Sequence, residues 1–329
     1  MYLPKISIIT PSYNQGQYLE QTIDSVLSQN YSNVEYCIID GGSIDNSVEI
    51  IKKYEKHLRY WVSEKDNGQS HAINKGFERA TGEVFNWLNS DDYYLPNALK
   101  TVGEHFSDSN INVLCAKSRI VYENMTLKIS SGTDIFKDNL AKTIGWARID
   151  QPETFFRKSC LDKIGGVNEH FHFVMDKELW VRYLFQFGLD NVKEVENQLV
   201  AFRLHQTSKT STRQSDFEAE TNALFYQIAL DLDMVSLAEK IAHESLPKQI
   251  PVCNFNNSDI KLLYQSLHYF LLYKYLRYYA ENKFVKAKSL ASILDFGVYS
   301  QKDLAEYKKI SHRMKYPVAF KKLINLLSM

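Results

Sequence analysis

The sequence predicts an open α/β fold in which parallel strands alternate with helices. Two apolar runs, Ile6 to Ile9 and Val34 to Ile39, have the composition of buried strands. Between them, Leu19, Ile23, Val26 and Leu27 repeat at the spacing of one helical face. Strands and helices that alternate in this way form βαβ units, whose sheets bind ligands beyond the carboxyl ends of the strands.

The remaining elements of this half follow in a regular order. We expect, in sequence, a polar turn at Thr10 to Asn14, a helix around Val48 to Lys56, a strand at Tyr60 to Val62, a helix from near Ser70, a strand at Val84 to Leu88, and a polar loop closed by Pro96. The polar clusters Thr10 to Asn14, Asp40 to Ser43 and Asn89 to Asp92 would then meet at one edge of the sheet.

The segment Trp87 to Asp92 carries the clearest chemical signal, because two adjacent acids, Asp91 and Asp92, follow an apolar strand. Hard divalent cations take oxygen ligands, and Mg²⁺ often binds one or two carboxylates together with substrate phosphates. The segment therefore indicates a cation and a diphosphate substrate. The alternative is that both acids only cap the helix that begins near Pro96.

Four segments, taken together, resemble the family 2 glycosyltransferases of GT-A fold. They read ISIITPSYN, IIDGGSIDNS, GQSHAINKGFERATGE and WLNSDD, and the resemblance extends to about Thr210. It implies a Rossmann-like open mixed sheet with helices on both faces. It also implies an inverting enzyme that moves a sugar from a nucleoside diphosphate donor, with UDP favoured, to a hydroxyl of a glycan or lipid-linked acceptor in bacterial surface polysaccharide or lipooligosaccharide synthesis.

The resemblance assigns the nucleotide to the first two strand ends. Pro11 and Tyr13 would flank the base, and Asp40 would accept its polar hydrogens. Asp66 and Asn67 are candidates for base or ribose contacts, although both they and Asp40 also fit ordinary turns. The predicted nucleotide-binding set is completed by Thr10, Asn89 and Ser90.

The resemblance places Mn²⁺ or Mg²⁺ on Asp91, and His205 is a further candidate contact to the metal or a phosphate. Two departures from the family pattern stand out. The usual Asp-x-Asp motif begins here with Asn89, and the usual Ala-Arg-Asn triplet is replaced by Ala72-Ile73-Asn74. Lys75 and His71 are the candidates to replace the missing cation.

A predicted helix that includes Leu179, Trp180, Tyr183, Leu184 and Phe187 has Asp176 at its start. The family's catalytic acid occupies the same place in an acid-x-x-x-Trp pattern, so Asp176 is the predicted general base and Glu178 the reserve. An N-cap role for Asp176 is the alternative. The predicted acceptor or donor-sugar side comprises Asp92, Gln151, Glu153 and Glu178.

Composition favours a globular enzyme of more than one domain, with 329 residues of which 44% are hydrophobic and 24% charged. A net charge of zero gives no indication of nucleic-acid binding. The four cysteines form no C-x-x-C pair, which argues against zinc and disulfide scaffolds. Without a signal-like start or a long apolar run, we expect a cytoplasmic protein.

We expect a GT-A domain over residues 1–215 and a helical domain over 216–329. Its predicted helices are Phe217 to Leu232, Leu237 to Ser245, Asp259 to Tyr279 and Phe284 to Leu294. Basic residues from Lys302 to Lys322 accompany an apolar stripe of Phe320, Leu323, Ile324 and Leu327. Such a segment suits the inner face of the plasma membrane, or packs as an ordinary helix. The tyrosines between Tyr264 and Tyr279 suit a core or a homo-oligomer interface.

Three rival classes remain. A nucleotidyltransferase would be expected to have a glycine-rich, basic phosphate loop after the first strand, whereas Thr10 to Gln17 has one glycine and no basic residue. A dinucleotide oxidoreductase would require G-x-G-x-x-G at this position. A catalytically silent sugar-nucleotide-binding protein is favoured by Asn89 and Ile73, while Asp91 and Asp176 argue for activity.

Overall fold

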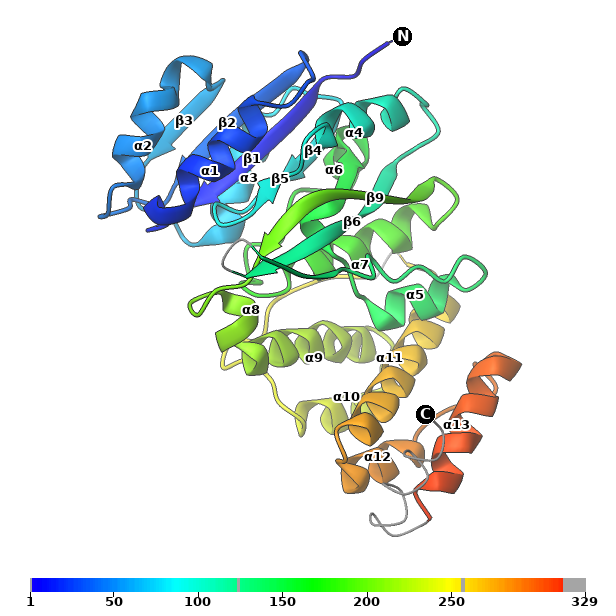
Figure 1. The fold of residues 1–329 in the computed structure, drawn as a ribbon. Coiled ribbons are helices and arrows are strands. Elements are labelled where there is room, and N and C mark those ends of the chain that lie inside the picture. Colours follow the sequence, from blue (N-terminus) through cyan, green and yellow to red (C-terminus); the bar gives the residue numbers. More distant parts are fainter. Residues whose placement is uncertain (1, 123–124, 256–257, 316–329) are drawn as a thin grey trace.

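The computed structural model describes residues 2–122, 125–255 and 258–315, and it shows a mixed nine-stranded sheet with a helical layer below it (Figure 1). The strands are β1 (Ile6–Ser12), β2 (Val34–Asp40), β3 (Tyr60–Ser63), β4 (Val84–Trp87), β5 (Tyr93–Tyr94), β6 (Val113–Tyr122), β7 (Met125–Ile129), β8 (Thr154–Arg157) and β9 (Val192–Arg203). The helices are α1 (Gly16–Leu27), α2 (Ser47–Tyr54), α3 (Gln69–Arg79), α4 (Ala98–Phe106), α5 (Leu140–Trp146), α6 (Lys158–Ile164), α7 (Met175–Phe187), α8 (Lys209–Thr212), α9 (Gln214–Asp231), α10 (Val235–Ala242), α11 (Ile260–Ala280), α12 (Phe284–Ala291) and α13 (Gln301–Arg313).

Eight strands follow the order β3-β2-β1-β4-β8-β6-β9-β5, which combines a parallel half with an antiparallel insertion, and the ninth strand, β7, pairs with β6 beside this path. Strands β1 to β4 are parallel, and Ile9 pairs with Cys37 on one side and Trp87 on the other. Strand β8 runs antiparallel to both β4 and β6. Strands β2 and β4 lie on opposite sides of β1, so the strand order reverses there. A ligand crevice is therefore expected at the carboxyl ends of β1 and β4. The predicted fold class is confirmed.

Alternating side chains of the central strands build separate cores on the two faces of the sheet. Ile8 belongs to the core that includes α1, α2 and α4, whereas Ile9 belongs to the core that includes α3, α6 and α7. This is the period of two that a strand buried on both faces requires.

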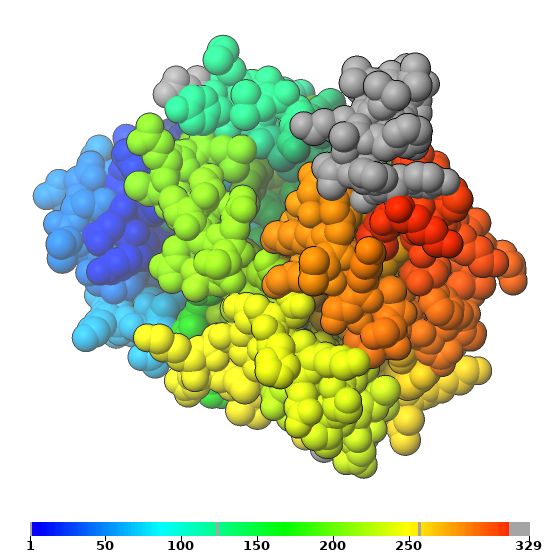
Figure 2. Space-filling view, turned by 90° about the horizontal axis from the view of Figure 1, so that it is seen from below, coloured from blue at the N-terminus to red at the C-terminus, as the bar shows by residue number. Residues whose placement is uncertain are grey.

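The C-terminal helices share the second of these cores. Tyr269 and Tyr275 of α11 are buried in the same cluster as Trp180 of α7, which confirms that these tyrosines belong to the core. Seen from below, the chain from α9 onward packs directly beside the sheet region (Figure 2). The division at residues 215 and 216 stays a prediction, because one continuous core crosses it.

The contact between α5 and α11 depends on Gly145. A Cβ atom at this position would lie 2.5 Å from Tyr269 Cβ and 2.7 Å from the Ser266 carbonyl oxygen. We expect Gly145→Ala to lower the free energy of unfolding by about 1–3 kcal/mol, the usual cost of overpacking. Urea denaturation measures this change. Gly297→Ala, whose nearest contact is the Asp295 side chain at 3.2 Å, should cost less, and an equal cost would contradict the packing explanation.

Helix α13 is fixed to α5 through Asp303, which is 3% exposed and accepts a bond of 2.5 Å from Lys142 Nζ. Lys302, Lys308 and Lys309 are exposed. The predicted apolar stripe of Phe320, Leu323, Ile324 and Leu327 lies outside the described residues, so membrane contact stays a prediction. Within the part of the chain that the structure describes, no helix is long and apolar enough to cross a membrane.

Candidate active site

A cavity of about 650 Å³ opens where β1, β2 and β4 end and is closed by the segments before α7 and around α8. Nine of the predicted site residues line it, namely Pro11, Tyr13, Asp66, Asn89, Ser90, Asp91, Asp92, Gln151 and Asp176. The three polar clusters expected at one sheet edge therefore all reach one cavity, although the second contributes Gly41 instead of Asp40.

The loop between β4 and β5 holds its two acids differently. The Asp92 carboxyl is buried, and its Oδ1 accepts a hydrogen bond of 2.9 Å from the Arg203 backbone N–H. Burial, and then repulsion from Asp91, raises the pKa of Asp92 well above its ordinary value. Asp91 is the more exposed of the two acids and lines the cavity. Asp91 is therefore better suited to meet a charged ligand.

Asp91 pairs with His205, which follows β9. The Asp91 Oδ2 and His205 Nε2 atoms lie 2.9 Å apart, and His205 Nδ1 lies 2.9 Å from the Thr207 hydroxyl. This separation is that of a hydrogen bond, and the Asp91 carboxylate and the His205 imidazole are also side chains that could hold a divalent cation. No cluster of three or more metal-binding side chains occurs among residues 2–122, 125–255 and 258–315. The diphosphate would then supply further ligands.

Asp176 lies in the first turn of α7 and lines the cavity. Burial raises the pKa of its carboxyl to about 6, although the Lys177 backbone N–H donates to Oδ1 at 2.8 Å. Burial also lowers the pKa of the Lys177 ammonium to about 8. At neutral pH Asp176 is therefore ionised and is a stronger base than an ordinary aspartate.

The raised pKa of Asp176 predicts a stability that depends on pH. In the folded chain the pKa of Asp176 is about 6, above its ordinary value of 3.8. The stabilisation of the folded state by the protonated carboxyl is therefore fully present below about pH 4 and is lost as the pH rises through 6. We expect Asp176→Asn to melt at a higher temperature than the wild type at pH 8. The difference should shrink towards pH 4, and scanning calorimetry across this range tests it. A difference independent of pH would contradict the assignment.

Three of the predicted nucleotide-binding residues do not line the cavity. Thr10 is buried and its hydroxyl lies 2.9 Å from that of Tyr36. Asn67 is exposed, with its backbone N–H bonded to His71. The buried Asp40 carboxylate accepts hydrogen bonds from the backbone N–H of Ser43 at 2.8 Å and the Ser63 hydroxyl at 2.7 Å. In this structure the side chain holds its own loop, and its role in binding the base stays a prediction.

Glu153 and Glu178 do not line the cavity either, and their place on the acceptor or donor-sugar side stays a prediction. Both Glu178 oxygens are bonded to Arg182, at 2.7 and 2.8 Å, and the carboxylate is buried. Residues two apart on a helix face different sides, so Glu178 points away from the cavity that Asp176 lines. Glu153 is 1% exposed and accepts a bond from the Ser130 hydroxyl, and burial raises its pKa to about 8.

The neighbouring Gln151 does line the cavity. Its Nε2 donates to the side-chain oxygen of Asn86 at 2.7 Å and to the Trp87 carbonyl at 2.8 Å. These bonds tie the segment before β8 to the end of β4.

The cavity also contains polar residues that were not predicted as site residues. Lys209 Nζ donates to Gln69 Oε1 at 2.9 Å, and Gln69 Nε2 donates to Asn89 Oδ1 at 2.8 Å. The expected substitute Lys75 instead pairs with Glu64 at 2.7 Å, and neither residue lines the cavity. Lys209 therefore places a cation at the cavity. The only sequence signal was the polar run from Leu204 to Thr210.

An open mixed sheet with an acidic loop at its crevice and a carboxylate at the start of α7 is the arrangement expected of a glycosyltransferase of GT-A fold. The family model for glycosyl transferase family 2 matches residues 7–171, and the chain belongs to this family.

The chain is similar to bacterial relatives of the same kind. It is 27% identical over 229 residues to an uncharacterised glycosyltransferase, RT0329, of Rickettsia typhi, with 66% of this chain and 69% of the relative covered. It is 26% identical over 239 residues to another, alr2836, of Nostoc, covering 67% and 71%. The glycosyltransferase GlyG of Streptococcus pneumoniae is 32% identical over 112 residues, covering 33% and 37%.

Two solved structures share the fold. TarS 1-349 of S. aureus in complex with UDP-GlcNAc has a TM-score of 0.57 at 17% identity, covering 84% of this chain and 73% of that one. The mannosyltransferase PcManGT of Pyrobaculum calidifontis, in complex with GDP-Man and Mn²⁺, has a TM-score of 0.54 at 14% identity, covering 100% and 85%. At these identities the likeness shows the fold alone.

Proposed function

We propose that the chain transfers a sugar from a nucleoside diphosphate donor, with UDP favoured, to a hydroxyl of a glycan or lipid-linked acceptor, with inversion. One observation carries this proposal: Asp91, whose carboxylate pairs with His205, and Asp176 both line one cavity at the carboxyl ends of the strands. The TarS complex with UDP-GlcNAc supports a UDP-sugar as the first donor to test.

The nucleotide would enter beside β1. Tyr13, which is 61% exposed at the cavity, offers an aromatic face to the base, and Asp66 offers an acceptor for its N–H groups. The diphosphate would then lie against Asp91 and His205, and Lys209 would supply a positive charge beside it. A bound Mn²⁺ or Mg²⁺ would neutralise charge that develops on the leaving diphosphate.

Asp176 would remove the proton from the acceptor hydroxyl as that oxygen attacks the anomeric carbon. A single displacement needs only one base, and the new bond forms on the face opposite the leaving group, which inverts the configuration. The burial that raises the pKa of Asp176 to about 6 strengthens it as a base while leaving it ionised at neutral pH.

The acceptor would belong to bacterial surface polysaccharide or lipooligosaccharide synthesis at the cytoplasmic side of the membrane, as the family resemblance implies, and the relatives cited above are bacterial glycosyltransferases. A catalytically silent sugar-nucleotide-binding protein is the alternative. It is favoured by Asn89, whose amide binds Gln69 and brings no negative charge to the Asp-x-Asp position.

A melting-temperature panel of nucleotides and nucleotide sugars, with and without Mn²⁺, tests the donor. Binding to the folded state stabilises it by about 2.7 kcal/mol at a ligand concentration one hundred times the Kd. We expect UDP and UDP-sugars to raise the melting temperature, more strongly with Mn²⁺. The panel then supplies the donor for a transfer assay with glycan acceptors. No shift with any nucleotide would refute the proposal, and binding without transfer would favour the silent alternative.

A further inference from the structure

Helix α9 of the C-terminal region supplies a buried carboxylate to the start of α7. Glu220 is 4% exposed, and its Oε2 accepts from the backbone N–H groups of Phe173 at 2.8 Å and Val174 at 3.1 Å. Both of its oxygens also lie within 3.0–3.1 Å of the His172 N–H. Three backbone donors of the turn that enters α7 are therefore satisfied by one side chain.

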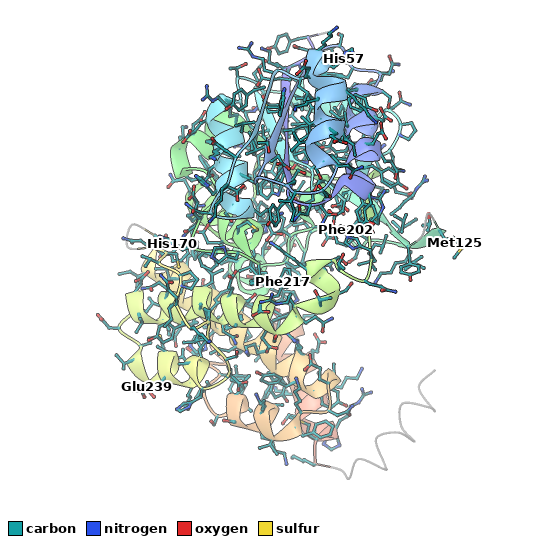
Figure 3. All side chains as sticks on the ribbon, turned by 90° about the vertical axis from the view of Figure 1, so that its left-hand side faces the viewer. His57, Met125, His170, Phe202, Phe217 and Glu239 are labelled. Carbon is teal, nitrogen blue, oxygen red and sulfur yellow. The ribbon has the colours of Figure 1, made fainter. Side chains whose placement is uncertain are left out.

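A second contact from α9 reaches the other side of the same turn. The hydroxyl of Thr221 accepts a hydrogen bond from the side-chain Nζ of Lys177 at 3.1 Å. The backbone N–H of the same Lys177 donates to Asp176 Oδ1. The Phe173 and Phe217 rings pack edge to face, 5.5 Å apart. Figure 1 shows α9 directly beneath α7, and Figure 3 labels Phe217 at the level where the helical region meets the sheet domain. Helix α9 therefore contacts the residues on both sides of Asp176 in the chain, residues 172–174 before it and Lys177 after it.

We propose that Glu220 is a positioning residue for the Asp176 base, so that the helical region completes the active site. This inference rests on the proposed function. A carboxylate at a helix N-terminus is favoured by the helix dipole as well as by its hydrogen bonds. Without this anchor the turn from His172 to Asp176 would relax, and a misplacement of about 1 Å at a catalytic group can cost about 100-fold in rate.

The test compares Glu220→Gln with a matched control on the same helix. The amide keeps the size of the side chain but removes its charge and turns one acceptor into a donor. We expect kcat to fall about 100-fold, with KM for the donor changed less than about 2-fold. Glu218→Gln makes the same chemical change two residues away, where the carboxylate pairs with Lys274 and Arg277 instead. This control should keep nearly full kcat.

Glu220→Asp, which keeps the charge on a shorter side chain, should recover part of the lost kcat. A general loss of packing would lower the melting temperature of Glu220→Gln and Glu218→Gln alike and would give no such recovery. Equal kcat in wild type and Glu220→Gln would overturn the proposal, as would equal losses in Glu220→Gln and Glu218→Gln.

Amide hydrogen exchange gives a readout that needs no substrate. We expect the N–H groups of His172, Phe173 and Val174 to exchange at least about 10-fold faster in Glu220→Gln, and at the wild-type rate in Glu218→Gln. Unchanged exchange in Glu220→Gln would overturn the proposal. A wild-type chain that transfers no sugar would instead refute the proposed function, and the exchange rates would still decide whether Glu220 holds the turn.

Discussion

Replacing Asp176 by asparagine is expected to lower acceptor-dependent turnover by about 1,000-fold while leaving donor affinity unchanged. General base catalysis typically contributes between about 100-fold and 10,000-fold, and an amide cannot take the proton. Asparagine keeps the size and one hydrogen-bond acceptor of the side chain, so the first turn of α7 should survive. Steady-state transfer kinetics measure the turnover, and calorimetry with UDP and Mn²⁺ measures donor binding.

The control for this experiment is Asp190→Asn, which removes an exposed carboxylate shortly after α7. It should retain full turnover. If Asp176→Asn also turned over at the wild-type rate, the base would have to be another group, and the proposed mechanism would be wrong.

Replacing Asp91 by asparagine is expected to remove the ability of Mn²⁺ to tighten UDP binding, and to lower turnover at least about 100-fold. The reason is that Asp91 is the carboxylate of the Asp91–His205 pair, and hard cations depend on charged oxygen ligands. Titration of UDP at several Mn²⁺ concentrations measures the effect. His205→Ala should weaken the Mn²⁺ dependence less, because it leaves the carboxylate in place.

An exposed acid, Asp138, provides the matched substitution for Asp91. Asp138→Asn should show the same Mn²⁺ dependence as the wild type. Wild-type tightening by Mn²⁺ in Asp91→Asn would show that the cation binds elsewhere.

The parallel half of the fold was predictable because its signals are local. Apolar runs such as Ile6 to Ile9 and helical periodicity in α1 mark their elements without reference to distant residues. The antiparallel insertion was not predicted in the same way, since β8 pairs with β4 and β6, and these strands are far apart in the chain. The residues before β8 likewise gave no local signal of their 3₁₀ turn at Gln151–Glu153, after which β8 begins at Thr154.

The sequence was sufficient to predict which loops form the candidate site, but not which way the side chains of those loops point. Strand ends identified Pro11, Tyr13 and Asp91, which line the cavity, but equally selected Asp40, which turns back into its own loop. Lys209 reaches the cavity, and Glu220 reaches the segment before α7, from distant parts of the chain through tertiary contacts alone. A single sequence contains no local pattern that reveals such contacts.

A crystal structure of the chain with UDP and Mn²⁺ tests most directly whether one cavity binds both nucleotide and cation. We predict that the uracil lies beside Tyr13 and that Asp91 and His205 hold the Mn²⁺ next to the diphosphate. Asp176 should lie across the cavity from the nucleotide, with the space for the acceptor between them. Nucleotide bound outside this cavity, or a metal ion without Asp91 as a ligand, would contradict the account.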